Sequence, residues 1–263
     1  MLNKLFFLSI LLIGFSCQNS PDNSLVETDK KNTPGNQLTN EIQAKVDKIN
    51  AEAESLTVAN SLSYQHNDGS SEEVFAYLDK DQHIMKIEEK FKNGKTGDAG
   101  IRLFYFENGK RIMSVERFID AEKAQGQFRE RISFYKKTGE VTSTMERKAV
   151  YEEDLEKVEF KSVETYDCSM EIAENVLNQK GVFATTFQGF ASDGPVDYLI
   201  VGGPGESGYA SALAVQYADN IFKQLKTNEA KMINTPLSIE FEKMMDERKL
   251  EFQVLTGLKI VAK

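Results

Sequence analysis

Histidine and cysteine, the side chains that most often act as metal ligands or nucleophiles, are scarce in this chain of 263 residues. The only histidines, His66 and His83, lie in or beside polar turns, near Asp68 and Asp81. A metal site needs several ligands at fixed spacing, and neither flank offers a second histidine or a cysteine. We therefore expect two solvent-exposed loop histidines and no bound metal.

The only cysteines are Cys17 and Cys168. Cys168 lies at the start of a helical stretch, where the pattern favours a buried small side chain over a nucleophile. If the thiol of Cys17 is modified, Cys168 has no disulfide partner within the chain. Stability is then expected to come from packing, without a disulfide.

A glycine-rich run at 202–208 has a spacing that occurs in phosphate-binding loops, because Gly203 and Gly208 match the glycines of GxxxxGK[ST]. That motif needs a lysine where this chain has Tyr209, and a serine or threonine where it has Ala210. Without the lysine charge the run is better explained as a turn between two strands. We expect no nucleotide and no cofactor.

Carboxylates are abundant, so an adjacent pair such as Glu88 and Glu89 does not by itself indicate acid–base catalysis. The nucleophile-elbow, zincin and serine–lysine signatures are absent. We assign no catalytic residue and expect a non-enzymatic binding or envelope-structural role. The alternative is an extracytoplasmic hydrolase that acts on glycans through scattered carboxylates.

The first residues have the pattern of a secretory signal. Lys4 precedes an apolar run, Leu5–Ile13, which is too short for the roughly 20 residues that a membrane-spanning helix needs. The next residues, Gly14-Phe15-Ser16-Cys17, resemble the lipobox of bacterial lipoproteins, although Gly14 stands where leucine is usual. The resemblance implies cleavage before Cys17 and a diacylglyceryl group on its thiol. The alternatives are an ordinary secreted protein and a short uncleaved anchor.

A polar segment follows the lipidation candidate Cys17 and continues to residue 37. Its composition cannot bury enough apolar surface to offset its ordering entropy, so we expect a flexible tether. No acidic residue follows Cys17 directly, which in such lipoproteins favours the outer membrane. We expect a lipid-anchored protein of the cell envelope, facing the periplasm or the cell surface, with an unknown protein or glycan partner.

The charge of the chain argues against nucleic acid as a partner. The formal net charge is −9 at pH 7, and removal of residues 1–16, whose one charge is Lys4, makes it −10. An acidic surface repels phosphate backbones.

Two patterns dominate the middle of the chain. Apolar residues at helical spacing from Ile42 to Leu56 predict a helix of about 15 residues that docks on the following sheet, capped by Thr39 or Asn40. Three similar units then follow, each a strand, a polar turn and a strand, and they cover 75–88, 103–116 and 132–146.

The three units predict an antiparallel meander of about six strands, with one aromatic and aliphatic face and one charged face. They resemble the hairpin-repeat modules, with tyrosine, an acidic residue, glycine and isoleucine, of bacterial exported proteins. Residues 151–163 keep alternating and could add a seventh strand, and the apolar residues from Met170 to Leu177 mark a helix that Gly181 ends.

The C-terminal pattern predicts strands at 182–190, 197–201 and 209–215, a helix at 219–232, and strands at 237–243 and 250–255. This order resembles the OB-fold, a five-stranded Greek-key barrel in which a helix joins the third and fourth strands. The alternative is a helix packed on an open antiparallel sheet. The resemblance implies a groove for oligonucleotides or oligosaccharides, and a basic groove is needed for the former. Tyr198 and Tyr209 are candidate ligand contacts that could stack on sugar rings, unless they pack in the core.

The predicted fold class is α+β, mostly β, with a meander of hairpin repeats followed by a small OB-like barrel with one helix. The expected divisions are a signal peptide at 1–16, the lipidated cysteine and tether at 17–37, a helix and meander at 38–165, a connecting helix at 166–181, and the barrel at 182–263.

Overall fold

The computed structural model describes residues 34–122, 126–216 and 218–261. The predicted signal peptide, Cys17 and most of the predicted tether lie outside the described residues. The structure is mostly β, as predicted, with fourteen strands joined in one sheet and few helices. No helix of the described ranges is both long and apolar enough to cross a membrane.

The first helix, α1, runs from Pro34 to Ala51 and begins earlier than predicted. The prediction of a cap at Thr39 or Asn40 is wrong, because the helix continues into the predicted tether. Proline is tolerated in the first turn of a helix, where its missing N–H would have no partner. Docking on the sheet is confirmed, since Ile42, Val46 and Ile49 pack against residues of the meander, among them Tyr105, Met113 and Phe134.

The predicted meander is confirmed as three antiparallel hairpins. They are β3 (Ser71–Leu78) with β4 (Ile84–Lys92), β5 (Ala99–Glu107) with β6 (Lys110–Asp120), and β7 (Gln127–Tyr135) with β8 (Val141–Ala149). Positive φ angles at Asn108 and Gly109 and at Gly139 turn the second and third hairpins. Such angles suit tight hairpin turns, which explains why these residues marked them.

Short elements complete the edges of the meander. After a 3₁₀ turn, Ala53–Ser55, strands β1 (Thr57–Asn60) and β2 (Tyr64–Gln65) pair with opposite ends of β3. The predicted seventh strand is correct only for β9 (Lys161–Val163), which pairs with β8. Residues Glu152–Lys157 instead form a 3₁₀ helix that buries Leu155.

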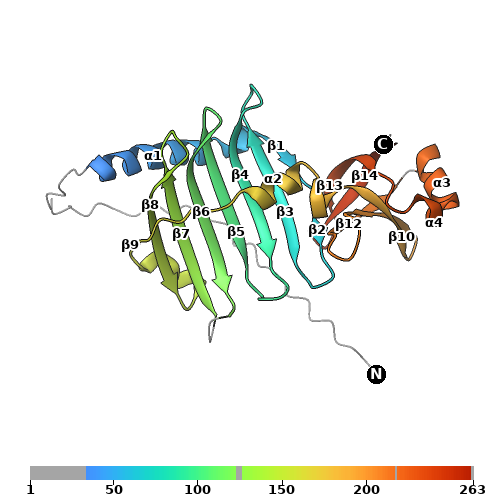
Figure 1. The fold of residues 1–263 in the computed structure, drawn as a ribbon. Helices are drawn as coiled ribbons and strands as arrows, with labels where there is room; N and C mark the ends of the chain where they lie inside the picture. The colour runs from blue at the N-terminus through green and yellow to red at the C-terminus, as the bar shows by residue number, and fades with distance from the viewer. Residues whose placement is uncertain (1–33, 123–125, 217, 262–263) are drawn as a thin grey trace.

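Both faces of the meander are covered. In Figure 1, α1 crosses one face, and the chain from β9 crosses the other face before reaching α2 (Glu171–Leu177). This crossing segment, residues 164–170, is held by Arg111, which donates hydrogen bonds of 2.5 Å to the Cys168 carbonyl and to Asp167 Oδ1. Ser133 Oγ also donates to the Tyr166 carbonyl at 2.6 Å.

The C-terminal part has the strand order of the OB-fold. Strands β10 (Thr186–Asp193), β11 (Val196–Gly202) and β12 (Ala210–Val215) form an antiparallel meander. After α3 (Asn220–Thr227) and α4 (Glu229–Met232), β13 (Leu237–Met245) pairs with β14 (Glu251–Ile260). Strand β14 then lies parallel to β12, and an isolated bridge links Thr186 of β10 to Pro236, the residue before β13.

These pairings run in the order β10–β11–β12–β14–β13 and return to β10 through one isolated bridge, which is the strand order expected of the predicted OB-like barrel. Two details differ from the prediction. The strand expected from residue 182 begins only at Thr186, because Gly181–Phe183 form a 3₁₀ turn that packs Phe183 against Tyr64 and Tyr209. The single predicted helix is two short helices that meet at Asn228.

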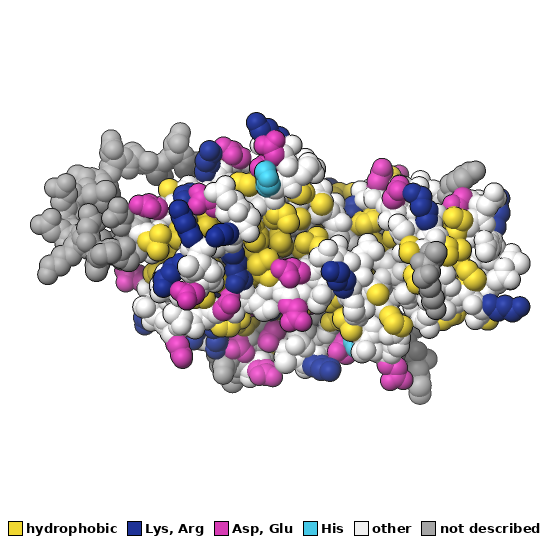
Figure 2. All heavy atoms as spheres, turned by 45° about the horizontal axis from the view of Figure 1, so that its top comes forward, with side chains coloured by type: hydrophobic (Ala, Val, Ile, Leu, Met, Phe, Trp, Pro, Cys, Tyr) yellow, Lys and Arg dark blue, Asp and Glu magenta, His cyan; other side chains and the backbone are white. Residues whose placement is uncertain are grey.

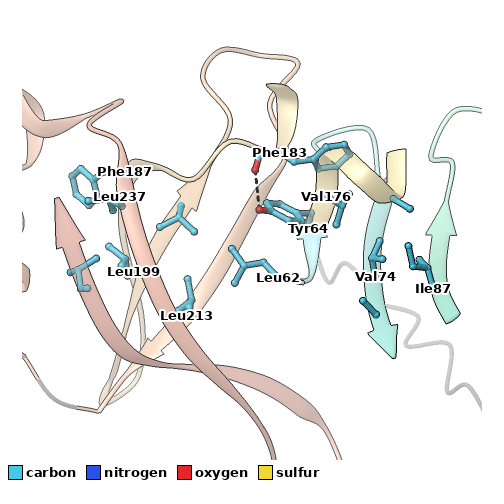
Figure 3. Packing of buried hydrophobic residues seen from close by; sticks show 14 of the residues in the cluster. Leu62, Tyr64, Val74, Ile87, Val176, Phe183, Phe187, Leu199, Leu213 and Leu237 are labelled. Carbon is cyan, nitrogen blue, oxygen red and sulfur yellow. Dashed lines mark hydrogen bonds between the residues drawn. The ribbon is translucent and has the colours of Figure 1, made fainter. Parts of the chain in front are cut away.

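One apolar core passes from the meander into the barrel (Figure 3). It includes Val74 and Ile87 of the meander, Val176 of α2, and Phe187 and Leu199 of the barrel. Between them lie Leu62 and Tyr64, whose hydroxyl donates a hydrogen bond of 2.9 Å to the Phe183 carbonyl. Burial raises the pKa of Tyr64 to about 12, so this phenol keeps its proton and remains a donor at physiological pH.

Replacing Tyr64 with phenylalanine should lower the free energy of unfolding by about 1–3 kcal/mol, because the buried Phe183 carbonyl loses its hydrogen bond to the phenol. Urea unfolding followed by circular dichroism measures the change. The matched control is Tyr151→Phe at an exposed tyrosine, 61% accessible, which should change stability by less than about 0.5 kcal/mol. Equal stability of the two variants would contradict the role of this hydrogen bond.

Candidate functional site

A hollow of about 720 Å³ lies where the meander meets the barrel. We call it the junction groove. Its walls come from the chain between β1 and β3, from β11, β12 and β14, and from one residue of β3. The lining residues are Ser63, Gln65, His66, Asn67, Glu73, Tyr198, Ile200, Ala210, Ser211, Ala212, Glu251, Phe252 and Gln253. The groove exists because β2 pairs with β12 at Gln65 and Ala210, which brings the barrel against the meander.

Amide and hydroxyl groups at one wall of the junction groove hold one another in place. Gln253 is buried, and its Nε2 donates to Ser211 Oγ at 2.8 Å while its Oε1 accepts from the Ser63 backbone at 2.9 Å. Ser211 Oγ in turn donates to the Ser63 carbonyl at 2.8 Å. This network ties β14 and β12 to the chain before β2, so the groove has a preformed, uncharged polar wall.

The carboxylates of the junction groove share one cation. Lys243 on β13 pairs with Glu73 and, at 3.3 Å, with Glu251, and its ammonium lies 4.5 Å from the centre of the Phe75 ring. Ser63 Oγ also donates to Glu73. Both carboxylates are therefore engaged in contacts within the protein.

The two tyrosines singled out from the sequence lie in different places. Tyr198 is partly buried and lines the junction groove. Tyr209 packs with its ring centre 4.6 Å from that of Phe183 and 5.2 Å from that of His66. Burial also raises the pKa of Tyr209. Tyr209 lines a smaller pocket instead, so the structure does not bring the pair together.

The histidines also differ from each other. The prediction of a solvent-exposed loop residue holds for His83 but is wrong for His66, which is partly buried. His66 Nδ1 lies 2.9 Å from Asp68 Oδ1, and Nε2 lies 3.0 Å from the Glu206 carbonyl. The hydrogen bond to Asp68 raises the pKa of His66. These contacts tie the turn before β3 to the glycine-rich loop of the barrel.

A group of possible metal ligands, Asp79, Asp81 and His83, lies in the exposed β3–β4 turn, with one ligand atom of each within 4.8 Å of the others. Asp79 Oδ1 already accepts from the backbone N–H groups of Asp81 and His83, at 2.9 Å each. The turn borders a hollow of about 580 Å³ under α1. Figure 2 shows hydrophobic side chains in the middle of the forward-turned face, with acidic and basic side chains spread around them.

The glycine-rich run joins two strands, β11 and β12, as predicted. A Cβ at Gly203 would meet the Val182 carbonyl oxygen at 2.3 Å, and one at Gly208 would meet the Gly203 carbonyl oxygen at 2.1 Å. These glycines are therefore required by close backbone packing. Cys168 is buried, as predicted, and burial raises the pKa of its thiol to about 12. A thiol with this pKa is a poor nucleophile.

A ladder of alternating charges crosses the meander beneath the crossing segment. Glu89, Arg102, Glu116, Arg131 and Glu146 are direct cross-strand neighbours on β4 to β8. The ion-pair distances along the ladder are 2.5, 2.8, 3.5 and 2.9 Å. The predicted charged face therefore exists, but its charges are largely buried and paired.

The ladder ends at β3, where Val74 lies opposite Glu89. Glu89 is fully buried and Glu72 is 7% accessible, and Oε2 of each has no hydrogen-bond partner among the described residues. Burial, and then the charge of Glu89, raise the pKa of Glu72 to about 8. Burial also raises the pKa of Glu89. This end of the ladder therefore holds a carboxyl group that keeps its proton at neutral pH.

Sequence reasoning missed most of this site. Ser63, Ser211 and Gln253 are small or neutral polar residues far apart in the chain, and no spacing links them. The one signal in the sequence was a polar residue inside an otherwise apolar part of a strand, namely Gln253 between Phe252 and Val254. The ladder residues had a clearer signal, because the second and third hairpins each place an arginine opposite a glutamate, Arg102 with Glu116 and Arg131 with Glu146.

Glu72→Gln should change how stability depends on pH. Between the ordinary carboxyl pKa of 4.5 and the folded-state value of about 8, the folded state binds more protons than the unfolded state, so rising pH favours unfolding. The natural chain should therefore lose stability relative to Glu72→Gln as pH rises from about 5 to 8. Urea unfolding at several pH values measures both curves, and parallel curves would contradict the raised pKa of Glu72.

No family model, curated protein or solved structure matches this chain.

Proposed function

We propose that the chain is a lipid-anchored protein of the bacterial cell envelope that binds a glycan in the junction groove without cleaving it. The observation that carries the proposal is the groove itself, in which Tyr198 lies with the fixed amide and hydroxyl wall of Ser63, Ser211 and Gln253. Binding sites of this kind combine an aromatic surface with a few convergent polar groups. Sugars present both complementary features, an apolar ring face and a rim of hydroxyl groups.

The location on an envelope membrane rests on the N-terminal sequence. The short apolar run and Gly14-Phe15-Ser16-Cys17 resemble a lipobox signal, and the acidic net charge of −9 disfavours nucleic acid as a ligand. A lipid-anchored binding protein would meet polysaccharides of the envelope at high local concentration.

A second candidate function is glycan hydrolysis, because Glu73 and Glu251 both line the junction groove. Glycoside hydrolysis uses two carboxyl groups, one as an acid and one as a base or nucleophile. Lys243 pairs with both carboxylates, so neither is free for these roles unless that contact opens. Binding without cleavage is therefore the better-supported function.

Tyr198→Ala should weaken glycan binding about tenfold, because loss of a ring contact in such a site costs about 1–2 kcal/mol. Isothermal titration of the full-length chain, purified in mild detergent, with a panel of neutral oligosaccharides measures the affinity. Tyr151→Ala, at an exposed tyrosine outside the groove, should bind like the natural chain. Equal loss in both variants, or no binding of any panel member by the natural chain, would exclude the groove as a glycan site.

The same panel separates binding from hydrolysis. Mass spectrometry after long incubation should find every oligosaccharide intact. Shorter products with the natural chain, absent with the double variant Glu73→Gln and Glu251→Gln, would favour the hydrolase.

Cys17→Ala should release the protein from the membrane fraction, because the short apolar run alone cannot span a bilayer. Fractionation and labelled palmitate test this. The natural chain should take up label and sediment with membranes, whereas the variant should do neither. Membrane retention of an unlabelled natural chain would contradict the lipid anchor.

A further inference from the structure

The end of the charge ladder at β3 opens into a second pocket. Its volume is about 330 Å³, and we call it the Glu72 pocket. Side chains alternate between the two faces of a strand, so Glu72 lines this pocket while its neighbour Glu73 lines the junction groove. The two hollows therefore lie on opposite faces of β3 and are independent sites.

A buried acceptor without a partner lies inside the Glu72 pocket. Glu72 is 7% accessible, and its Oε2 has no hydrogen-bond partner in the described part of the chain. Arg102, the nearest cation of the ladder, is already bonded to Glu89 and Glu116, at 2.5 and 2.8 Å. A buried carboxyl group left in this state is costly, and a ligand that donates hydrogen bonds to it would remove the cost.

The remaining walls indicate the chemistry of such a ligand. Phe91 and Ile172 supply apolar surface, and the exposed residues Lys92 and Lys95 supply cations at the mouth. Neither lysine forms an ion pair with a residue that the structure describes. The pocket thus offers a buried carboxyl group inside, an apolar wall, and two lysines at its exposed rim, where Asp68 and Asp98 are already engaged with His66 and with the Ala121 backbone.

We propose that the Glu72 pocket binds a small zwitterion of the amino-acid type. Its ammonium group donates to Glu72, its carboxylate faces Lys92 and Lys95, and an aliphatic side chain contacts Phe91 and Ile172. The volume equals that of about ten waters, which suits a free amino acid. A metal ion fits less well, because the described residues bring three candidate ligands together only at Asp79, Asp81 and His83.

Binding in this pocket should release a proton. Glu72 is protonated at neutral pH, and an incoming ammonium group stabilises its ionised form. The charged and titratable groups that face Glu72 or line the pocket are Glu89, Arg102, Asp68, Asp98, Lys92, Lys95 and Tyr209. Affinity should rise as pH approaches 8, because less work is then needed to remove the Glu72 proton.

Titration calorimetry of the full-length chain in mild detergent tests the proposal, with each of the twenty common amino acids as probe. Measurement at pH 7 in two buffers of different ionisation enthalpy gives the number of protons released. At least one aliphatic amino acid should bind with release of close to one proton. Its amide, which lacks the carboxylate, and the matching fatty acid, which lacks the amine, should each bind about tenfold more weakly.

Glu72→Gln should weaken binding about tenfold or more and abolish proton release. Glu88→Gln, which alters a carboxylate outside the pocket, is the matched control and should bind like the natural chain. Circular dichroism verifies that both variants are folded. The proposal is overturned if no amino acid binds the natural chain at millimolar concentration, if Glu72→Gln binds normally, or if the amide binds as tightly as the amino acid.

Discussion

The packing of Leu62 and Tyr64 between the meander and the barrel is the contact on which the rest of the molecule depends. These two side chains join the cores of the two halves, and the Tyr64 hydroxyl fixes the Phe183 carbonyl. The backbone pairing between β2 and β12 is a single pair, Gln65 with Ala210, so the halves are joined mainly through side chains, which include the contacts of Gln253 with Ser63 and of Lys243 with Glu73. The junction groove and the Glu72 pocket both result from this contact, because each is lined by residues of the meander and by residues of the barrel or of the chain that leads to it.

The charge ladder shows how a sheet covered on both faces accommodates ions. Removing charges from water is costly, and the cost is offset only where partners and geometry are good. From β4 to β8 each carboxylate has at least one arginine across the strand. At β3, Val74 lies opposite Glu89 and Phe91 lies opposite Glu72, so the paired strand supplies no cation there, and Glu72 Oε2 has no hydrogen-bond partner among the described residues. The Glu72 pocket, the strongest candidate ligand site on this face, therefore lies where the alternation of glutamate and arginine ends.

Much of the fold was predictable because it depends on local signals. Glycines such as Gly109 and Gly139, with alternating flanks, marked the hairpins, and the order of elements after Gly181 predicted the barrel. The start of α1 was missed because a polar composition does not prevent a helix from extending by more than a turn, here back to Pro34. Most of the junction groove was not predictable, since Ser63, Ser211 and Gln253 meet only through the β2–β12 and β12–β14 pairings. Tyr198 was identified because an aromatic side chain can stack on a sugar ring, and the structure places it, partly buried, in the wall of the junction groove.

The alternating charges of the ladder limit which strands can be added to this sheet. Strands that run in one direction, β4, β6 and β8, carry glutamate at the ladder position, and those that run in the other, β5 and β7, carry arginine. Any two oppositely directed strands thus match in charge, whereas two strands of the same direction repel. Duplication of the β5–β6 or the β7–β8 hairpin would insert one more arginine and one more glutamate and leave the charges of neighbouring ladder positions matched. At the ladder, a wider meander built by copying one of these units therefore needs no new charge pattern.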